Sequence, residues 1–314
     1  MSENILQPRN PVLFFFSRLL ILLGMAMVFM LFTMAIGLIC SKYLFGVDVF
    51  SNPTILNHFE TDPNVLNAFR LIQSLYAIGG FLIPALLFPR AIQQWPGQFL
   101  NYNRKPSWIL FAAALMLMVF STPLTSWLVQ LNEGIKFPAS MAEIEAQLKN
   151  AEDAAAHMTK AFIHTDSNAG FLLNILIIAI IPAICEEFMF RGAFMRLLMV
   201  CIRNKHMAIA LTAFVFSAFH GQFYGFIPRF ILGLILGYIA FYSNSIWPAV
   251  VAHFFNNAVA LFAEYFHWNE SSIRFIREDY NFPVIVILLS GIITGSLVWW
   301  MRNFRNKTEW YNGE

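Results

Sequence analysis

Long apolar blocks dominate this sequence and constrain its fold more than any other feature. A helix that crosses a bilayer needs about 20 apolar residues. Eight blocks reach or approach this length, at residues 11–40, 69–89, 107–131, 169–200, 206–222, 226–243, 245–266 and 282–301. The fifth and sixth are the weakest, because Pro228 and the short link GQFYGF lie between them. Since 58% of the residues are hydrophobic and 12% are charged, a soluble domain is excluded. The sequence predicts an all-α, polytopic membrane helix bundle with about eight transmembrane helices.

The ends of the apolar blocks predict an orientation in the membrane. The first block is too long for a signal-peptide core and follows the polar stretch MSENILQPRNP, so we expect it to remain as an anchor. With eight spans both termini lie on one side, and Lys and Arg near the helix ends favour the cytoplasm for that side. The expected location is a bacterial cytoplasmic (inner) membrane.

Charge and cysteine content exclude other classes of partner and chemistry. The net charge is +2 without a basic cluster, so we expect no nucleic-acid partner. Cys40, Cys185 and Cys201 are scattered among apolar segments without a CxxC spacing. We interpret them as small apolar residues.

The loop after the third block, at about residues 132–168, contains a helical pattern. Its apolar residues recur at spacings of 3 and 4, at Met141, Ile144, Leu148, Ala151, Ala155, Met158 and Phe162. This predicts one apolar face of a helix of about six turns. The segment is too polar to span the membrane, so we expect it to lie over the bundle or along the outer membrane surface. A helical cap is favoured, and a substrate gate or partner site stays open.

The fourth block carries charged residues, which are costly within a membrane and usually functional. Residues 182–192 read PAICEEFMFRG. Glu187 and Arg191 are four apart with the acid first, which favours an ion pair on one helix face. Glu186 points about 100° away. We therefore interpret Glu187 as a paired, orienting residue and Glu186 as a carboxylate available for proton chemistry.

Two further polar clusters lie at comparable depth. Phe216 and His220 are four apart in FSAFH, and His253 and Asn257 are four apart in HFFNN. At 1.5 Å per residue, Glu186 and His220 lie roughly 24 and 21 Å from the starts of their blocks, and His253 and Asn257 roughly 12 and 18 Å. In a bilayer core of about 30 Å, these depths are compatible with one buried layer.

A carboxylate, two imidazoles and an amide in one layer permit two kinds of chemistry. The set can position and deprotonate a water and stabilise an oxyanion. It can equally hold a divalent metal such as zinc through Glu186, His220 and His253, with an open position for water. The sequence lacks HExxH, which excludes a zincin-type site on a single helix. Whether a metal takes part stays open.

These motifs resemble those of a known family. In order and helix placement, Glu186-Glu187-x-x-x-Arg191, Phe216-x-x-x-His220 and His253-x-x-x-Asn257 are similar to the three motifs of the CPBP intramembrane proteases. That family is also called the type II CAAX prenyl endopeptidases or, in bacteria, bacteriocin-processing or Abi proteins. The resemblance covers about residues 170–265.

The resemblance implies a role for each matched position. Glu186 would be the general base that activates water, and His220 would help to hold that water. The other matched residues would support them: Glu187 and Arg191 by bracing the site, His253 and Asn257 by stabilising the oxyanion or completing the water site. The family has been described both as metalloproteases and as metal-free glutamate proteases. Two His and one Glu on separate helices lead us to favour the glutamate type.

The expected activity is hydrolysis of a peptide bond in a membrane-associated peptide or protein. Eukaryotic relatives remove the last three residues of prenylated CAAX proteins, whereas bacterial relatives are associated with peptide maturation, bacteriocin immunity or membrane-protein regulation. Membrane lipid and a peptide or membrane-protein substrate are the expected partners. The substrate, its prenylation and the oligomeric state stay open.

The predicted organisation has three segments. Residues 1–168 hold the first three transmembrane helices and the extracytoplasmic helical loop. Residues 169–266 form the CPBP-like catalytic core of four helices, and residues 267–314 hold the last transmembrane helix and a cytoplasmic tail.

Two alternatives keep the same helices but change the function. Buried Glu, Arg, His and Asn also occur in ion- or proton-coupled transporters, where they form relays. Against this alternative, the chain has no repeated half and its polar residues concentrate in one four-helix region. A membrane scaffold in which the motifs serve only structure is the third possibility.

Overall fold

The computed structural model describes residues 10–59, 61–163, 165, 167–202, 204–266 and 280–311, and these residues contain helices and no strands. The predicted all-α, polytopic bundle is confirmed. The long and medium helices are α1 (Pro11–Phe45), α2 (Pro63–Ala77), α3 (Ile83–Ala91), α5 (Trp108–Glu133), α6 (Ala142–Ile163), α10 (Lys205–Phe219), α11 (Phe226–Ser243), α12 (Trp247–Tyr265) and α13 (Val284–Tyr311). Shorter helices are α4 (Pro96–Phe99), α7 (Asn168–Asn174), α8 (Ile181–Glu187), α9 (Met195–Cys201) and the 3-10 turns η1 (Pro53–His58) and η3 (Ala139–Met141). Three π-helical turns complete the set: η2 (Ile78–Leu82), η4 (Ile175–Ile180) and η5 (Phe188–Phe194).

The helices correspond block by block to the apolar pattern of the sequence. Among the described residues, six helical segments are long and apolar enough to cross a membrane: Pro11–Phe45, Pro63–Ala91, Trp108–Glu133, Asn168–Cys201, Phe226–Ser243 and Val284–Arg305. The fifth and seventh blocks form the shorter apolar helices Lys205–Phe219 and Trp247–Ala263. The sixth block, expected to be weak, is a full 18-residue helix. Its Pro228 lies in the first turn of α11, where its missing N–H needs no helical partner.

The chain forms two compact units. Unit 1 comprises Met1–Asn103 and Lys160–Ala208, and unit 2 comprises Arg104–Thr159 and Ile209–Glu314. The three segments predicted along the chain stay a prediction. The start of the last one, residues 267–279, lies outside the described residues.

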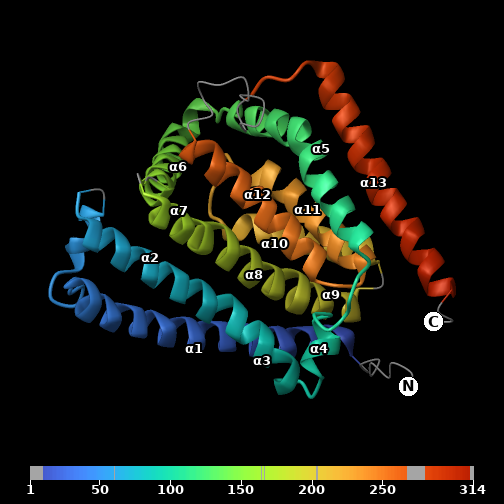
Figure 1. The fold of residues 1–314 in the computed structure, drawn as a ribbon, viewed down its shortest axis with the longest axis horizontal. Coiled ribbons are helices and arrows are strands. Elements are labelled where there is room, and N and C mark those ends of the chain that lie inside the picture. Colours follow the sequence, from blue (N-terminus) through green and yellow to red (C-terminus); the bar gives the residue numbers. More distant parts are fainter. Residues whose placement is uncertain are drawn as a thin grey trace. The chain divides into compact units, whose positions relative to one another are not determined.

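In unit 1, α1 contacts α2, η2 and α3, and Figure 1 shows α1 and α2 side by side. Asn10 caps α1 by accepting hydrogen bonds from the N–H groups of Val12 and Leu13, both at 3.1 Å, which satisfies two donors of the first turn. Gly79 permits the close approach of α1 to η2, because a Cβ at this position would lie 1.9 Å from the Thr33 hydroxyl.

Two of the π turns in unit 1 are followed by a proline. η2 ends at Leu82 before Pro84, and η4 ends at Ile180 before Pro182. A proline inside a helix removes one backbone hydrogen bond and its ring clashes with the carbonyl four residues earlier. The wider π turn moves that carbonyl away, so the helix continues past the proline. The apolar pattern predicts one helical block at residues 169–200 and gives no sign of the π turns within it.

The C-terminal end of α6, residues 160–163, belongs to unit 1 and is held by two polar side chains. The buried Arg70 of α2 donates a hydrogen bond to the Phe162 carbonyl. The Nδ2 group of Asn174, on α7, donates to the Ile163 carbonyl at 2.8 Å. These two contacts satisfy carbonyls that have no partner within the helix.

Unit 2 is built around α5, which contacts α11, α12 and α13. Figure 1 shows α13, in red, running along α5, in green. Pro123 interrupts α5, and the hydroxyl of Ser290 on α13 inserts at this point. It donates to the Phe120 carbonyl at 2.6 Å and accepts from the Leu124 N–H at 3.2 Å. In an unbroken helix these two groups would bond to each other. The Ser290 hydroxyl therefore bridges the missing backbone hydrogen bond of α5 and joins α13 to α5.

The predicted loop helix is present as α6, but its packed face differs in part from the prediction. Leu148, Ala155 and Met158 are half-buried and Phe162 is buried, whereas Met141, Ile144 and Ala151 are exposed. Glu145 and Glu152 are half-buried in their place. Both carboxylates accept backbone hydrogen bonds, Glu145 from Phe137 at 3.3 Å and Glu152 from Tyr224 at 3.2 Å, which is why acidic residues occupy this face.

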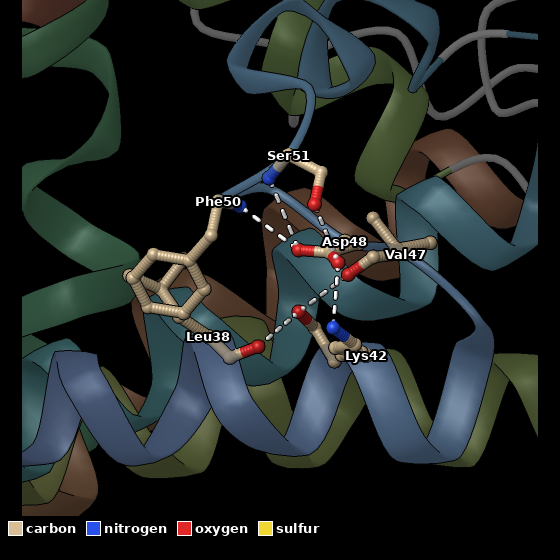
Figure 2. Close-up of polar contacts among 7 residues, drawn as sticks. Leu38, Lys42, Val47, Asp48, Phe50 and Ser51 are labelled. Carbon is tan, nitrogen blue, oxygen red and sulfur yellow. Dashed lines mark hydrogen bonds and ion pairs between the residues drawn. The ribbon is translucent and has the colours of Figure 1, made fainter.

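The connection after α1 is fixed by Asp48 (Figure 2). Its Oδ1 accepts hydrogen bonds from the N–H groups of Phe50 and Ser51 at 3.1 and 3.2 Å. Its Oδ2 accepts from the Ser51 hydroxyl at 2.9 Å and pairs with the Lys42 ammonium at 2.7 Å. The Lys42 hydrogen bond, followed by those from Ser51, lowers the pKa of the Asp48 carboxyl from 3.8 to about 2.

Candidate active site

The charged motif of the fourth block lies in unit 1, at the junction of α8 and η5. The Arg191 Nη1 group donates to the Glu187 Oε1 atom at 2.8 Å, and both side chains are 0% exposed. The structure therefore contains the ion pair that the spacing predicts. A charge-assisted hydrogen bond of this kind is stronger than a neutral one and fixes both side chains.

Glu186 and Glu187 occupy different environments although they are adjacent. Glu186 is half-buried at the C-terminal turn of α8, whereas Glu187 is fully buried. This difference follows from the rotation of about 100° between successive residues of a helix. The structure thus places one carboxylate in the ion pair and turns the other to a different face, as the sequence predicts.

The helix changes form directly after these carboxylates. Residues Phe188–Phe194 form the π turn η5, which closes with a hydrogen bond from the Met195 N–H to the Phe190 carbonyl. π turns are rare within α-helices, and those that do occur are often found at functional sites. The turn is packed by aromatic rings, since Phe190 contacts Phe81 with centroids 5.9 Å apart and Phe188 stacks on Tyr102 at 6.1 Å.

His220 lies directly after the last turn of α10 in unit 2, and its ring orientation is set by the backbone. Its Nδ1 atom lies 2.9 Å from the Phe216 carbonyl oxygen. A carbonyl only accepts hydrogen bonds, so Nδ1 must carry the proton. In the neutral ring the lone pair is then on Nε2. This is the nitrogen that can hold a water or bind a metal.

The side chain of Phe216 connects the two histidine motifs. Its ring meets the His220 ring edge-on with centroids 5.0 Å apart, and the His253 ring edge-on at 6.0 Å. Phe216 and His253 are 1% and 4% exposed. The Phe216 ring of the second motif therefore contacts the imidazoles of both histidine motifs.

Gly233 of α11 makes room for this arrangement. A Cβ at Gly233 would lie 3.0 Å from the Ala213 Cβ and 3.2 Å from the Phe216 ring. Such distances are shorter than ordinary van der Waals contact. A larger residue at position 233 would therefore displace the ring that both imidazoles contact.

Asn257 lies on α12, one turn after His253, and is half-buried. The two residues share a helix face because they are four apart. The second and third motifs thus both belong to unit 2, whereas Glu186, Glu187 and Arg191 belong to unit 1. The convergence of all three motifs in one layer stays a prediction.

The His220 and His253 side chains of unit 2 could supply part of a metal site. A neutral His220 with its Nδ1–H on a backbone carbonyl has the usual orientation of a histidine ligand. Two His and one Glu are also the protein ligands of some catalytic zinc sites. Within either unit, the described residues include no group of three or more His, Cys, Asp and Glu side chains that could hold a metal.

Comparison with known families identifies the segment that carries all three motifs. Residues 168–259 match the family model described as type II CAAX prenyl endopeptidase Rce1-like. This segment is a CAAX-protease domain. It begins with α7 and extends into α12, so it contains every residue of the predicted site. No curated protein and no solved structure matches the chain.

The family assignment and the helices together establish the general class. The chain is an integral multi-pass membrane protein with a CAAX-type protease domain. The match at residues 168–259 leaves α1 to α6 and α13 outside the CAAX-protease domain.

The structure shows two residues near the second motif that the sequence analysis missed. Asn132, in the last turn of α5, and Glu152 of α6 both bond to the link between α10 and α11. The position of Glu152 could have been predicted from the sequence, because it lies four residues after Leu148 and three before Ala155 on the packed face of α6. No sequence pattern predicts the role of Asn132, since its hydrogen-bond partners are remote in sequence.

Proposed function

We propose that the chain is an intramembrane endopeptidase in which Glu186 activates a water for attack on a peptide carbonyl. The observation that carries the proposal is the contact of both the His220 ring and the His253 ring with Phe216, within the segment that matches the protease family. Two imidazoles that contact one aromatic ring in a membrane protein are polar groups that can hold a water and stabilise an oxyanion.

The proposed reaction assigns one task to each group. Glu186 takes a proton from the water while the water oxygen bonds to the peptide carbonyl carbon. The Nε2 atom of His220 holds the water, and His253 and Asn257 stabilise the oxyanion of the tetrahedral intermediate. Collapse of the intermediate breaks the C–N bond, and Glu186 returns its proton to the leaving amine.

Glu187 and Arg191 have a supporting task in this proposal. Their buried ion pair fixes the helix turn that carries Glu186. Because Glu187 already accepts from Arg191 at 2.8 Å, its carboxylate is held in the ion pair, and we assign the attack on water to Glu186 instead.

A metal-dependent form of the same reaction would use the same residues. Glu186, His220 and His253 would hold zinc, which would supply a water of lowered pKa. We favour the glutamate type, with one Glu and two His on separate helices. Activity retained after treatment with 1,10-phenanthroline, with substoichiometric metal in the active preparation, supports this choice. Loss of activity that added zinc restores would establish the metal-dependent form.

The substrate class follows from the membrane and the family. We propose a membrane-associated peptide or protein cleaved at a bacterial cytoplasmic membrane, with prenylated and unmodified C-terminal peptides as the two classes to compare. The protein reconstituted in nanodiscs is incubated with matched fluorescent CAAX peptides, one farnesylated and one carrying an unmodified cysteine.

The decisive measurement is the incorporation of oxygen from water into the cleaved peptide. In water enriched in oxygen-18, hydrolysis places one heavy oxygen in the new C-terminal carboxyl group, which mass spectrometry detects. Label that appears with wild type and not with Glu186→Gln supports the proposal. Proton flux into liposomes without any cleavage of either peptide would favour the transporter instead.

A further inference from the structure

The link between α10 and α11, taken together with Phe226, the first residue of α11, spans residues 221–226, follows His220 directly and is held from three sides. We call this segment the His220 loop. Its sequence is GQFYGF. Its hydrogen-bond partners Asn132, Glu152 and Ser217 lie on α5, α6 and α10 and belong to unit 2. Loops of this length usually vary in position unless their backbone groups are bonded, so these bonds decide where the loop sits.

Asn132 holds the C-terminal half of the loop with both ends of its amide. Its Nδ2 group donates to the Phe223 carbonyl at 2.8 Å, and its Oδ1 atom accepts from the Ile227 N–H at 3.1 Å. The residue is 1% exposed. Because the amide fixes a carbonyl in the loop and an N–H in the first turn of α11, it determines where α11 begins relative to the loop.

Two further contacts hold the same loop. The Ser217 hydroxyl, one turn before His220, donates to the Phe226 carbonyl at 2.6 Å. The Glu152 carboxylate accepts from the Tyr224 N–H at 3.2 Å. The Lys149 ammonium also lies 6.0 Å from the centroid of the Tyr224 ring. The loop is therefore bonded on one side to the helix that carries His220 and on the other to α5 and α6.

We propose that Asn132 is a positioning residue for peptide hydrolysis, acting through the His220 loop on the imidazole of His220. The proposal rests on the proposed function. The N–H of His220 donates to the Ser217 carbonyl at 3.2 Å, at the point where the loop begins. Release of the loop from Asn132 loosens this turn and with it the Nδ1 contact to the Phe216 carbonyl. The Nε2 atom then loses its fixed place beside the substrate.

The test compares Asn132→Leu with Asn174→Leu. Asn174 is the matched control because it is also a fully buried asparagine that donates to one backbone carbonyl at 2.8 Å, but it bonds to Ile163 and not to the His220 loop. Both variants lose a buried hydrogen bond, so both are expected to lose stability. Per folded molecule, we expect kcat to fall by about 10–100-fold in Asn132→Leu. KM should change less than threefold, and Asn174→Leu should retain wild-type kcat.

Asn132→Asp gives a second test that does not depend on the folding of the leucine variant. The carboxylate keeps an acceptor for the Ile227 N–H but loses the donor to Phe223, and protonation restores a donor. The kcat of this variant relative to wild type should therefore rise as the pH falls. Glu152, the other titratable group bonded to the loop, is present in both proteins, so the ratio at each pH removes its effect.

The outcomes separate the two claims. A wild-type protein that cleaves peptides, with unchanged kcat in Asn132→Leu and a flat pH ratio in Asn132→Asp, overturns the positioning role and leaves the proposed function intact. Equal losses of kcat in the Asn132 and Asn174 variants also overturn it. Absence of peptide hydrolysis by wild type overturns both claims.

Discussion

The guanidinium of Arg191 and the carboxylate of Glu187 form an ion pair at 2.8 Å in which both side chains are 0% exposed. The pair lies at the entrance to the π turn η5, one residue after Glu186. Two opposite charges buried together are tolerated only as long as both are present. The conformation of this helix turn therefore depends on the presence of both charged side chains.

Removal of one partner should destabilise the protein more than removal of both. Glu187→Gln leaves the Arg191 charge buried without its counter-ion, at an expected cost of about 3–5 kcal/mol in the free energy of unfolding. The double variant Glu187→Gln/Arg191→Met removes both charges and should recover most of this loss. Tryptophan fluorescence during denaturant unfolding in micelles measures the difference. Equal stability of the single and double variants would refute the coupling.

Gly233→Ala should reduce activity by displacing Phe216. The added methyl group would lie 3.0 Å from the Ala213 Cβ and 3.2 Å from the Phe216 ring, and such overpacking typically costs about 1–3 kcal/mol. Gly291→Ala is the control, because a Cβ there meets nothing within 4 Å. Peptide turnover per folded molecule should fall in the first variant and stay at wild-type level in the second. If Gly233→Ala is as active as wild type, the Phe216 contact does not position the imidazoles.

The features that could be predicted from the sequence are those set by neighbouring residues. Hydropathy over about 20 residues located all eight apolar helices. The four-residue spacing of Glu187 and Arg191 sufficed for their ion pair, because that contact lies within one helical turn. The contact of Phe216 with His220 also lies within one turn, whereas the contact of Phe216 with His253 needed the packing of α10 on α12.

The features that could not be predicted depend on residues far apart in the chain. Asn132 bonds to Phe223 across 91 positions and Glu152 to Tyr224 across 72. No local pattern identifies such partners. The apolar periodicity of α6 likewise failed at Glu145 and Glu152, because a backbone N–H from another segment makes a carboxylate acceptable on a packed face.

Acid should remove a specific contribution of Asp48 to stability. Its bonds to Lys42 and Ser51 lower its pKa from 3.8 to about 2. A lowered pKa in the folded protein means that the contribution is full above about pH 4 and is lost as the pH falls towards 2. The difference in thermal midpoint between wild type and Asp48→Asn should therefore shrink over this window. A difference that is constant from pH 6 to 2 would contradict this assignment.

The orientation predicted from the positive residues can be tested with fusions. Alkaline phosphatase joined within α6 should be active, because we expect the loop at 132–168 outside the cytoplasm. Green fluorescent protein joined after residue 314 should fluoresce, because we expect the C-terminus inside. The reverse pattern, with an active phosphatase at the C-terminus, would show that the termini are extracytoplasmic.

The central claim is that Glu186 is the base for water attack, and its most direct measurement is the initial rate of peptide cleavage by Glu186→Gln in nanodiscs. The substitution keeps the size of the side chain and removes its ability to take a proton. Loss of a general base should lower kcat by about 10²–10⁴-fold at an unchanged unfolding midpoint. A Glu186→Gln protein that folds normally and cleaves the peptide at the wild-type rate would contradict the account.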